Sequence, residues 1–311
     1  MSYLAIIDLG SNSTRMVVEE IQADGRVVEL IRQKSDTRLA EGMLQNNGAL
    51  TQAAMTRVCQ AIRTFAESYD AYPDVKIIGI ATAAVREATN QNEFTERLLR
   101  EFGVEVQVLS GDQEAYYDYL GAVSALDISD AWLLDTGGAS VELVGIQDRM
   151  AANFISLPFG AVNLTERFEL NKAGLIDTQA LSAAQDYVAA QFENLPWVES
   201  DQLPIILLGG ANRTLARLDR RRQKLVDEAD FHGYTMPTER VVQTFNELNA
   251  MTLAQRAELL GVEANRADII ISGLLPLMQL ITLTDAKKVI FSASGVREGV
   301  LQEYRLEAQE H

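Results

Sequence analysis

The stretch LAIIDLGSNSTRMVV, Leu4 to Val18, decides the fold. An apolar run ends at Asp8, a short turn of glycine, serine and asparagine follows, and a second apolar run begins at Met16. Apolar runs that flank a small polar turn are typical of two adjacent strands. The stretch therefore predicts a strand–turn–strand hairpin that carries Asp8 at its tip.

The same pattern returns in AWLLDTGGASVELVGI, Ala131 to Ile146, where Asp135 takes the place of Asp8. Strand and helix patterns alternate after each hairpin, which predicts an α/β fold built by internal duplication. We expect two related domains, 1–124 and 125–311, that pack across a cleft, with a last helix of about 297–311 that packs back on the first domain. The other predicted elements are strands at 26–34 (after an Asp-Gly turn at 24–25), 76–82, 104–109, 204–210 and 288–295, and helices at 50–70, with Thr51 as N-cap, and 90–103.

Composition narrows the function. The chain has 311 residues, 47% of them hydrophobic, with a net charge of −17, one cysteine and two histidines. The negative charge disfavours nucleic acid, and so few His and Cys residues argue against a zinc site, which leaves a hard ion such as Mg²⁺ held by oxygens. The sequence shows no signal-peptide pattern and no apolar run long enough to span a membrane, and its single cysteine suits a reducing compartment. These features predict a cytoplasmic protein.

Small polar residues at a strand tip suit phosphate, because glycine permits close approach and successive backbone N–H groups form an anion-binding concavity. The hydroxyls of Ser11, Ser13 and Ser140 add donors. An aspartate would repel phosphate, so Asp8 and Asp135 indicate a cation between carboxylate and ligand. The alternative is two ordinary hairpin turns with local side-chain bonds, and the match between the turns favours the phosphate clamp.

Seven segments, taken in order, resemble the exopolyphosphatase/guanosine pentaphosphatase (Ppx/GppA) family over about residues 3 to 305. Each segment alone is weakly specific, whereas the ordered set is highly specific. The resemblance implies two duplicated domains of the actin, Hsp70 and sugar-kinase type (ribonuclease H-like) around a central cleft, in the short two-domain form, and makes a homodimer plausible. The segments are DLGSNSTRMVV (8–18), ATAAVREATN (81–90), SGDQEA (110–115), DTGGASVEL (135–143), SLPFGAVNLTERF (156–168), RADIIISGLLPL (266–277) and SASGVREGV (292–300).

The resemblance implies a Mg²⁺-dependent enzyme that hydrolyses the terminal phosphoanhydride of inorganic polyphosphate or guanosine pentaphosphate. Glu114 matches the family's catalytic base, which would activate water, and Arg86 matches its phosphate-binding arginine. The structural alternatives are that Glu114, with Asp112, favours a helix N-terminus, and that Arg86 is a surface charge beside Glu87.

The resemblance also implies a metal site and a phosphate cradle. The implied metal ligands are Asp8, Asp135 and Glu142. For Arg297, in GVREG, a structural role is favoured over ligand binding, and His232 is expected to be structural. The implied cradle consists of Gly10, Ser11, Asn12, Ser13, Gly137, Gly138, Ala139 and Ser140.

Some positions depart from the family's pattern. Ala139 replaces the third glycine of the second loop, where a left-handed backbone would cost roughly 1–2 kcal/mol. Gln113 replaces a glutamate, which removes one negative charge near the metal. Ala211-Asn212 and Ala293 also differ, at positions where threonine and aspartate are common. Because the residues that match the base, the arginine and the metal ligands remain, we expect an active enzyme.

A basic segment, RTLARLDRRRQK at 213–224, stands apart in this acidic chain. Its spacing predicts that Arg213, Arg217, Arg220 and Lys224 share one helical face, which would guide a polyanion. The alternative is a solvated helix face paired with nearby acids. Together with Ala139 and Gln113, this segment supports a second functional hypothesis, a non-catalytic polyphosphate or alarmone binder. A kinase of the same superfold, for which no sugar-pocket signature is present, is the third.

Overall fold

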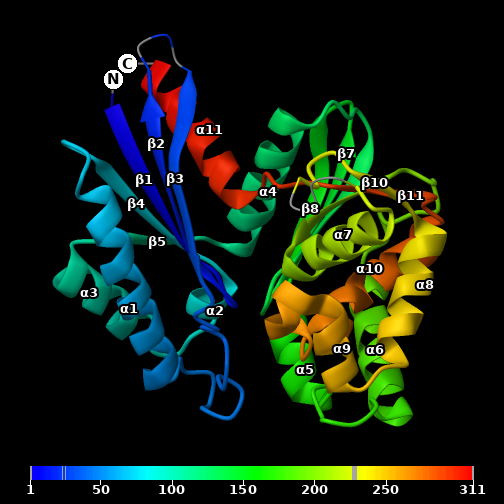
Figure 1. Ribbon diagram of the computed structural model, residues 1–311. Coiled ribbons are helices and arrows are strands. Elements are labelled where there is room, and N and C mark those ends of the chain that lie inside the picture. The colour runs from blue at the N-terminus through cyan, green and yellow to red at the C-terminus, as the bar shows by residue number, and fades with distance from the viewer. Residues whose placement is uncertain (1, 23, 25, 226–229, 310–311) are drawn as a thin grey trace. The chain divides into compact units, whose positions relative to one another are not determined.

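The computed structural model describes residues 2–22, 24, 26–225 and 230–309. The chain divides into two compact units, Met1–Gly111 with Arg305–His311 and Asp112–Tyr304, and each contains one β-sheet (Figure 1). This mixed α/β architecture confirms the predicted fold class. The domain boundary at 124/125 remains a prediction, because compactness alone does not show which segments fold independently.

The sheet of the first unit has the strand order β3-β2-β1-β4-β5. β1 and β2 form an antiparallel hairpin that β3 extends, whereas β4 and β5 continue the sheet in parallel. Because parallel strands need a crossover, helices connect β4 to β5. The elements are β1 (Ser2–Leu9), β2 (Thr14–Ile21), β3 (Val27–Ser35), α1 (Gln52–Tyr69), β4 (Lys76–Ala81), α2 (Ala83–Arg86), α3 (Gln91–Phe102) and β5 (Val106–Val108).

Local sequence signals set the helix ends in this unit. The side chain of Thr51 accepts a hydrogen bond from the Ala54 N–H at 3.2 Å and starts α1. Gly103 has φ 67°, a left-handed conformation that glycine adopts without strain, and it ends α3. Both predicted helices are confirmed. The predicted Asp-Gly turn falls partly outside the described residues, which include Asp24 but not Gly25.

The sheet of the second unit has the order β10-β11-β9-β6-β7-β8. β6, β7 and β8 are antiparallel, β9 and β11 run parallel to β6, and β10 adds an antiparallel edge. Its strands are β6 (Ala131–Thr136), β7 (Val141–Gln147), β8 (Met150–Leu157), β9 (Ile205–Gly209), β10 (Thr235–Pro237) and β11 (Lys288–Phe291). Its helices are α4 (Gly111–Ala125), α5 (Ala161–Phe168), α6 (Thr178–Glu193), α7 (Gly210–Arg222), α8 (Thr238–Asn249), α9 (Leu253–Leu260), η1 (Gly261–Arg266) and α10 (Ile270–Thr284). The last helix, α11 (Val296–Gln309), begins in this unit, and its residues from Arg305 onward belong to the first.

The two sheets share one topology. Strands β3-β2-β1-β4-β5 of the first sheet correspond in order and direction to β8-β7-β6-β9-β11 of the second. Asp8 pairs with Arg15 across the first hairpin, and Asp135 pairs with Glu142 at the equivalent place in the second. The internal duplication predicted from the two hairpins is thus confirmed, with β10 as an addition to the second sheet.

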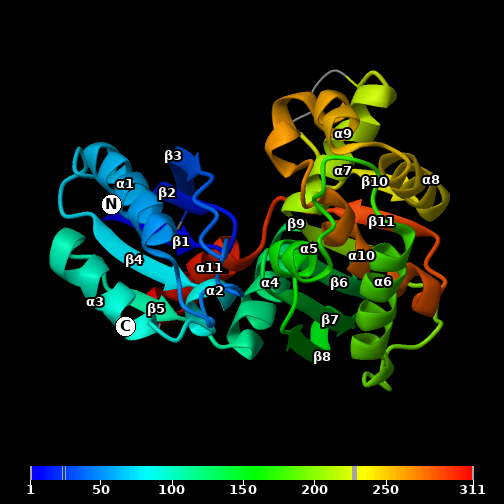
Figure 2. The ribbon, with the colours of Figure 1, turned by 90° about the horizontal axis from the view of Figure 1, so that it is seen from below.

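Alternating side chains of the second sheet enter two separate cores. Leu133 and Val144 pack with the α4 residues Ala115 and Ala122 on one face. Leu134 packs on the other face, with buried residues of α6, α7, α8 and α10. Figure 2 shows the helices of this unit around its sheet. Because strand side chains alternate, each residue of β6 and β7 can be assigned to the α4 face or to the opposite face.

Helix α10 is the most apolar helix of the second unit, and its burial explains this. Its residues Ile270, Leu274 and Leu277 all belong to the large core of that unit. Among the described residues, no single helix is long and apolar enough to cross a membrane. The segment Leu253–Arg266 reaches the required length and composition only when joined to α10, at a bend of 91°.

The predicted helical face of the basic segment is wrong at one position. Helix α7 ends at Arg222, and Gln223 caps it through a bond from its N–H to the Asp219 carbonyl. Lys224 then has φ 56°, in the left-handed region, so the helix does not continue through it. Lys224 therefore does not share a helical face with the arginines at 213, 217 and 220.

Candidate active site

The turn of the second hairpin uses its carbonyl groups and leaves its amides available. The Gly137 N–H donates to the Ser140 carbonyl at 3.0 Å and closes the turn. The carbonyls of Gly137 and Gly138 accept from the first amides of α5, those of Ala161 at 2.9 Å and Val162 at 2.7 Å. One side of the turn is thereby held by α5.

The other side of this turn presents three successive amides. Gly138, Ala139 and Ser140 are all buried, and within the described ranges their N–H groups donate no backbone or side-chain hydrogen bond. Buried backbone amides almost always have an acceptor in a native protein. Consecutive amides that lack one form a binding site for an anion such as phosphate.

The replacement of glycine by Ala139 does not strain this turn. Among the described residues, those with positive φ other than glycine do not include Ala139, so the cost of a left-handed alanine does not arise. Gly160 makes room for the backbone here, since a Cβ at Gly160 would lie 2.7 Å from the Ala139 nitrogen. Asn163 supports the turn from α5 by donating from Nδ2 to the Ala139 carbonyl at 3.2 Å.

The turn of the first hairpin, in the first unit, has the same bonding. The Gly10 N–H donates to the Ser13 carbonyl at 3.2 Å, and the carbonyls of Ser11 and Asn12 accept from the amides of Ala40 at 2.8 Å and Arg38 at 2.9 Å. In the described part of the chain, the amides of residues 11–13 donate no hydrogen bond. The predicted cradle residues of each turn therefore present the same unbonded backbone edge.

Four carboxylates of the second unit meet on the α4 face of its sheet. Because Leu133 and Val144 face α4, the strand alternation directs Asp135 and Glu142 to that face as well. Glu114 lies in the first turn of α4, and Asp118 follows one turn later, on the same side of the helix. One oxygen each of Asp118, Asp135 and Glu142 lies within 4.8 Å of the others.

Burial and mutual repulsion raise the pKa values of two of these acids. The pKa of Glu142 is well above its ordinary range, first because the group is buried and then because Glu114 and Asp135 are near. A hydrogen bond at 2.8 Å from the Ser156 hydroxyl acts in the opposite direction. The pKa of Asp118 is likewise raised well above its ordinary range by burial and then by Asp135. The cluster therefore needs protons or a cation to offset its charge.

The donor set of this cluster fits a hard divalent cation. Ionised carboxylates are acceptors only, and oxygen ligands are those that Mg²⁺ prefers. Asp135 and Glu142 from the predicted metal set belong to the cluster, whereas Asp8 lies in the first unit, where it is 9% exposed. Sequence reasoning missed Asp118, although its spacing of four residues from Glu114 on a helix was a usable signal.

The fold constrains the side chains of the predicted base and the predicted arginine, the first by burial and the second by polar contacts. Glu114 is buried, at 6% exposure, whereas its neighbour Asp112 on the same helical turn is exposed. Arg86, the last residue of α2, donates from a terminal nitrogen to the Leu109 carbonyl at 3.0 Å. It also pairs with Glu87 at 3.3 Å, so the contact foreseen in the structural alternative is present.

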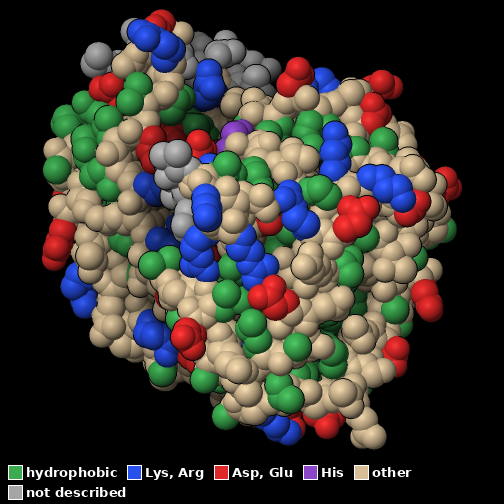
Figure 3. Space-filling model, turned by 45° about the vertical axis from the view of Figure 1, so that its right-hand side comes forward, with side chains coloured by type: hydrophobic (Ala, Val, Ile, Leu, Met, Phe, Trp, Pro, Cys, Tyr) green, Lys and Arg blue, Asp and Glu red, His purple; other side chains and the backbone are tan. Residues whose placement is uncertain are grey.

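Several residues of the basic segment are paired with acids. Arg217 forms an ion pair with Glu263, and Arg222 pairs with Glu247 at 2.8 Å. Arg217 also stacks on Phe231, and Arg220 stacks on the ring of Tyr234. Figure 3 shows basic and acidic side chains interspersed on one face of the molecule. These contacts favour the solvated, paired helix face, and a path for a polyanion stays a prediction.

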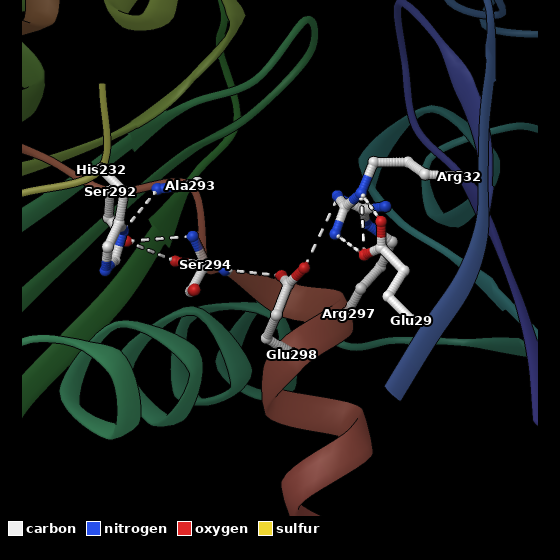
Figure 4. A network of polar contacts seen from close by, with 9 residues as sticks. Glu29, Arg32, His232, Ser292, Ala293, Ser294, Arg297 and Glu298 are labelled. Carbon is white, nitrogen blue, oxygen red and sulfur yellow. Dashed lines mark hydrogen bonds and ion pairs between the residues drawn. The ribbon is translucent and has the colours of Figure 1, made fainter. Parts of the chain in front are cut away.

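The segment before α11 is held by a chain of polar contacts, drawn in Figure 4. Nδ1 of His232 accepts from the Ala293 N–H at 3.2 Å, and its Nε2 lies 3.2 Å from the Ala125 carbonyl. The Gly295 N–H donates to Glu298 at 2.9 Å. Arg297 is buried and lies 3.7 Å from Glu298. These contacts are consistent with the structural roles predicted for His232 and Arg297.

Comparison with known proteins identifies the family. A model of the Ppx/GppA phosphatase family matches residues 17–308. The chain belongs to the Ppx/GppA phosphatase family. Phosphatases are hydrolases, so the family supports a hydrolytic enzyme.

Solved structures of similar proteins cover almost the whole chain. A Ppx/GppA family member from Aquifex aeolicus is 28% identical, with a TM-score of 0.80 over 99% of this chain and 98% of that one. An exopolyphosphatase from Cytophaga hutchinsonii is 21% identical, with a TM-score of 0.88 over 98% of each chain, and shows that the fold is shared.

A curated relative is longer than this chain. The bifunctional 3-dehydroquinate synthase/phosphatase of Fusobacterium nucleatum is 26% identical over 96% of this chain, but the match covers 46% of that protein. The chain thus spans about half the length of that relative.

Proposed function

We propose that this chain hydrolyses the terminal phosphoanhydride of a linear phosphate chain, inorganic polyphosphate or guanosine pentaphosphate, with a divalent cation such as Mg²⁺. The observation that carries the proposal is the second hairpin: three successive buried amides without acceptors, in the same hairpin as Asp135 and Glu142. Amides without acceptors suit phosphate oxygens, and clustered carboxylates suit the cation that accompanies them. The name of the Cytophaga relative, an exopolyphosphatase, supports this substrate class.

Phosphoryl transfer requires positioning, an oriented nucleophile and charge compensation more than covalent participation by the protein. The turn amides of residues 138–140 would hold phosphoryl oxygens, and the equivalent amides of residues 11–13 would hold phosphate from the first unit. Arg86 would add a charged donor. Asp135 and Glu142 would hold the cation, which when bound supplies positive charge to the phosphoryl oxygens; Asp8 stays a predicted ligand, to be tested by D8N.

Glu114 would orient the attacking water and accept its proton. A buried carboxylate can do this because both of its oxygens are hydrogen-bond acceptors, and Glu114 is only 6% exposed. Its position on the first turn of α4 fixes the carboxylate on the sheet face that carries Asp135. The proposed base and two of the proposed metal ligands, Asp135 and Glu142, belong to the same unit.

The test is phosphate release from long-chain polyphosphate and from guanosine pentaphosphate, with and without Mg²⁺. We expect Mg²⁺-dependent release that falls by about 10²-fold or more in Glu114→Gln, which keeps the shape and removes the base. Asp112→Asn is the matched control, because Asp112 lies on the same turn of α4 but is exposed.

Each contrary result has a distinct meaning. No release by the native chain from either substrate, with tight polyphosphate binding retained, contradicts hydrolysis and favours a binding protein. Release that is the same in Glu114→Gln and in the native chain shows that another group is the base. The faster of the two substrates identifies the preferred phosphate chain.

A further inference from the structure

Asp118 occupies a site that is costly for a carboxylate. It is 1% exposed, and no hydrogen bond of ordinary geometry reaches either of its oxygens; the nearby Val296 backbone amide acts against the burial that raises its pKa. A Cβ at Gly295 would lie 2.9 Å from Asp118 Oδ1 and 3.4 Å from the Leu208 side chain. Gly295, which has no side chain to offer a donor, thus borders the carboxylate. A buried carboxylate without donors is strongly destabilising unless a cation or a proton accompanies it.

The nearest charged groups to Asp118 are other acids. One of its oxygens lies within 4.8 Å of oxygens from Asp135 and Glu142. In the described part of the chain, no lysine or arginine forms an ion pair with Asp118. A buried carboxylate that no described basic side chain pairs with, and that faces two further carboxylates, suits the role of a cation ligand.

The number of carboxylates decides what such a site needs from its substrate. Mg²⁺ sites in phosphate-processing enzymes usually have one or two carboxylates and use the substrate's phosphates as further ligands. Three carboxylates from the protein alone can hold the ion without phosphate. Their spacing, at most 4.8 Å, suits a six-coordinate ion with oxygen distances of about 2.1–2.4 Å, for which ligands lie about 3–5 Å apart.

We infer that Asp118 is a third protein ligand of the divalent cation, with Asp135 and Glu142, and that the second unit therefore binds this cation before any phosphate arrives. The inference deepens the proposed function and rests on it for the class of metal. Its direct consequence is a metal-loaded state of the substrate-free protein. Helix α4 then contributes both a metal ligand and, one turn earlier, the proposed base Glu114.

The test measures Mn²⁺ binding to the full chain, without phosphate or substrate, by the loss of the free-ion electron paramagnetic resonance signal. Mn²⁺ is a probe with the oxygen preference of Mg²⁺, and competition with Mg²⁺ shows whether the ions share the site. We expect one tight Mn²⁺ per chain and a dissociation constant at least tenfold higher in Asp118→Asn. Asp112→Asn, on the same helix and outside the cluster, should bind within twofold of the native chain.

Binding of Mn²⁺ by Asp118→Asn within twofold of the native chain would overturn the inference. Thermal unfolding adds a second measurement: without metal Asp118→Asn should be at least as stable as the native chain, and with Mn²⁺ it should gain less. If the asparagine variant is not recovered folded, Asp118→Ala, which introduces no amide without partners, takes its place with the same expectation.

The metal measurement is independent of catalysis. A chain that binds Mn²⁺ through Asp118 but releases no phosphate would refute the proposed hydrolysis and support this inference. A chain that hydrolyses polyphosphate while Asp118→Asn keeps native Mn²⁺ affinity would support the proposed hydrolysis and refute this inference.

Discussion

In the first hairpin Asp8 faces Arg15 across the ladder, whereas in the second hairpin Asp135 faces Glu142 at the equivalent pair. Both turns are closed by the same bond, from a glycine N–H to a serine carbonyl three residues later. Opposite charges that face each other across an antiparallel pair stabilise it, and like charges destabilise it. The first hairpin therefore balances its own charge, while the second depends on a cation or protons.

This difference separates two requirements that a phosphate site combines. The turn backbone, which presents amides to an anion, is the same in both copies. The residue pair behind the turn has diverged, and only the second copy concentrates negative charge there. In the proposed function, backbone geometry would thus carry the anion binding in both copies, and side chains would decide which copy attracts a metal.

The largest expected effect is a loss of stability when the glycine in the strand beside the second turn is replaced. Gly209 pairs with Thr136 next to the second turn and has φ 90°, and a Cβ there would lie 2.4 Å from the Thr136 carbonyl oxygen. We expect Gly209→Ala to lower the free energy of unfolding by at least about 3 kcal/mol, since it adds a steric overlap to a backbone that alanine rarely adopts. Chemical denaturation measures the change.

The matched position beside the first turn is Ala81, which pairs with Leu9. It shows no positive φ among the described residues, so Ala81→Gly should lower stability by only about 1 kcal/mol through lost packing and added chain freedom. If Gly209→Ala and Ala81→Gly lowered the free energy of unfolding equally, the backbone beside the second turn would not be more constrained than the backbone beside the first.

The residue pairs behind the two turns, Asp135 with Glu142 and Asp8 with Arg15, give the next largest effect, on the rate of phosphate release. Glu142→Gln should lower phosphate release by about 10²-fold, roughly 2.7 kcal/mol in the barrier, because a metal ligand is lost. Arg15→Gln, the equivalent change in the first hairpin, should alter release by less than tenfold because Arg15 is not a proposed ligand. Steady-state rates at saturating Mg²⁺ measure both variants.

Stability should move in the opposite direction to activity in the second hairpin. Without metal, Glu142→Gln removes a buried carboxylate that faces other acids, so its melting temperature should equal or exceed that of the native chain. A lower melting temperature without metal would mean that Glu142 is compensated within the protein, and that the two hairpins do not differ in the way described.

The smallest effect concerns the last residue of the strand before each turn. Thr136 is buried and its hydroxyl makes no hydrogen bond, whereas the equivalent residue in the first hairpin is the apolar Leu9. Thr136→Val should raise the free energy of unfolding by about 0.5–1 kcal/mol, because it removes an unsatisfied polar group without a change of shape. A loss of stability would reveal a partner for this hydroxyl.

Much of the fold could be predicted because its signals are local. Alternation and turn residues defined the hairpins, a threonine marked the start of α1, and Gly103 marked the end of α3. The short helix α2 was not foreseen, since four residues (Ala83–Arg86) are too few to show a helical period. The end of α7 was misjudged because charged residues continue past it without a glycine or proline to signal the stop.

The candidate site was only partly predictable. Asp135 and Glu142 come from a turn that repeats within the chain, so the pattern itself pointed to them. Asp118 lies in a helix, among the tyrosines of residues 116, 117 and 119, and its meaning depends on the sheet face that α4 covers. That contact joins segments that are separate in sequence, and a linear pattern does not reveal it.

The four acids of the second unit are close in sequence as well as in space, since all lie between residues 114 and 142. One helix and one hairpin, Gly111 to Gln147, therefore encode the whole cluster. A single genetic exchange with breakpoints just outside these residues would transplant it intact into another member of the family. The acids of the proposed cation site could thus be inherited, or engineered, as one short segment while the rest of the fold diverges.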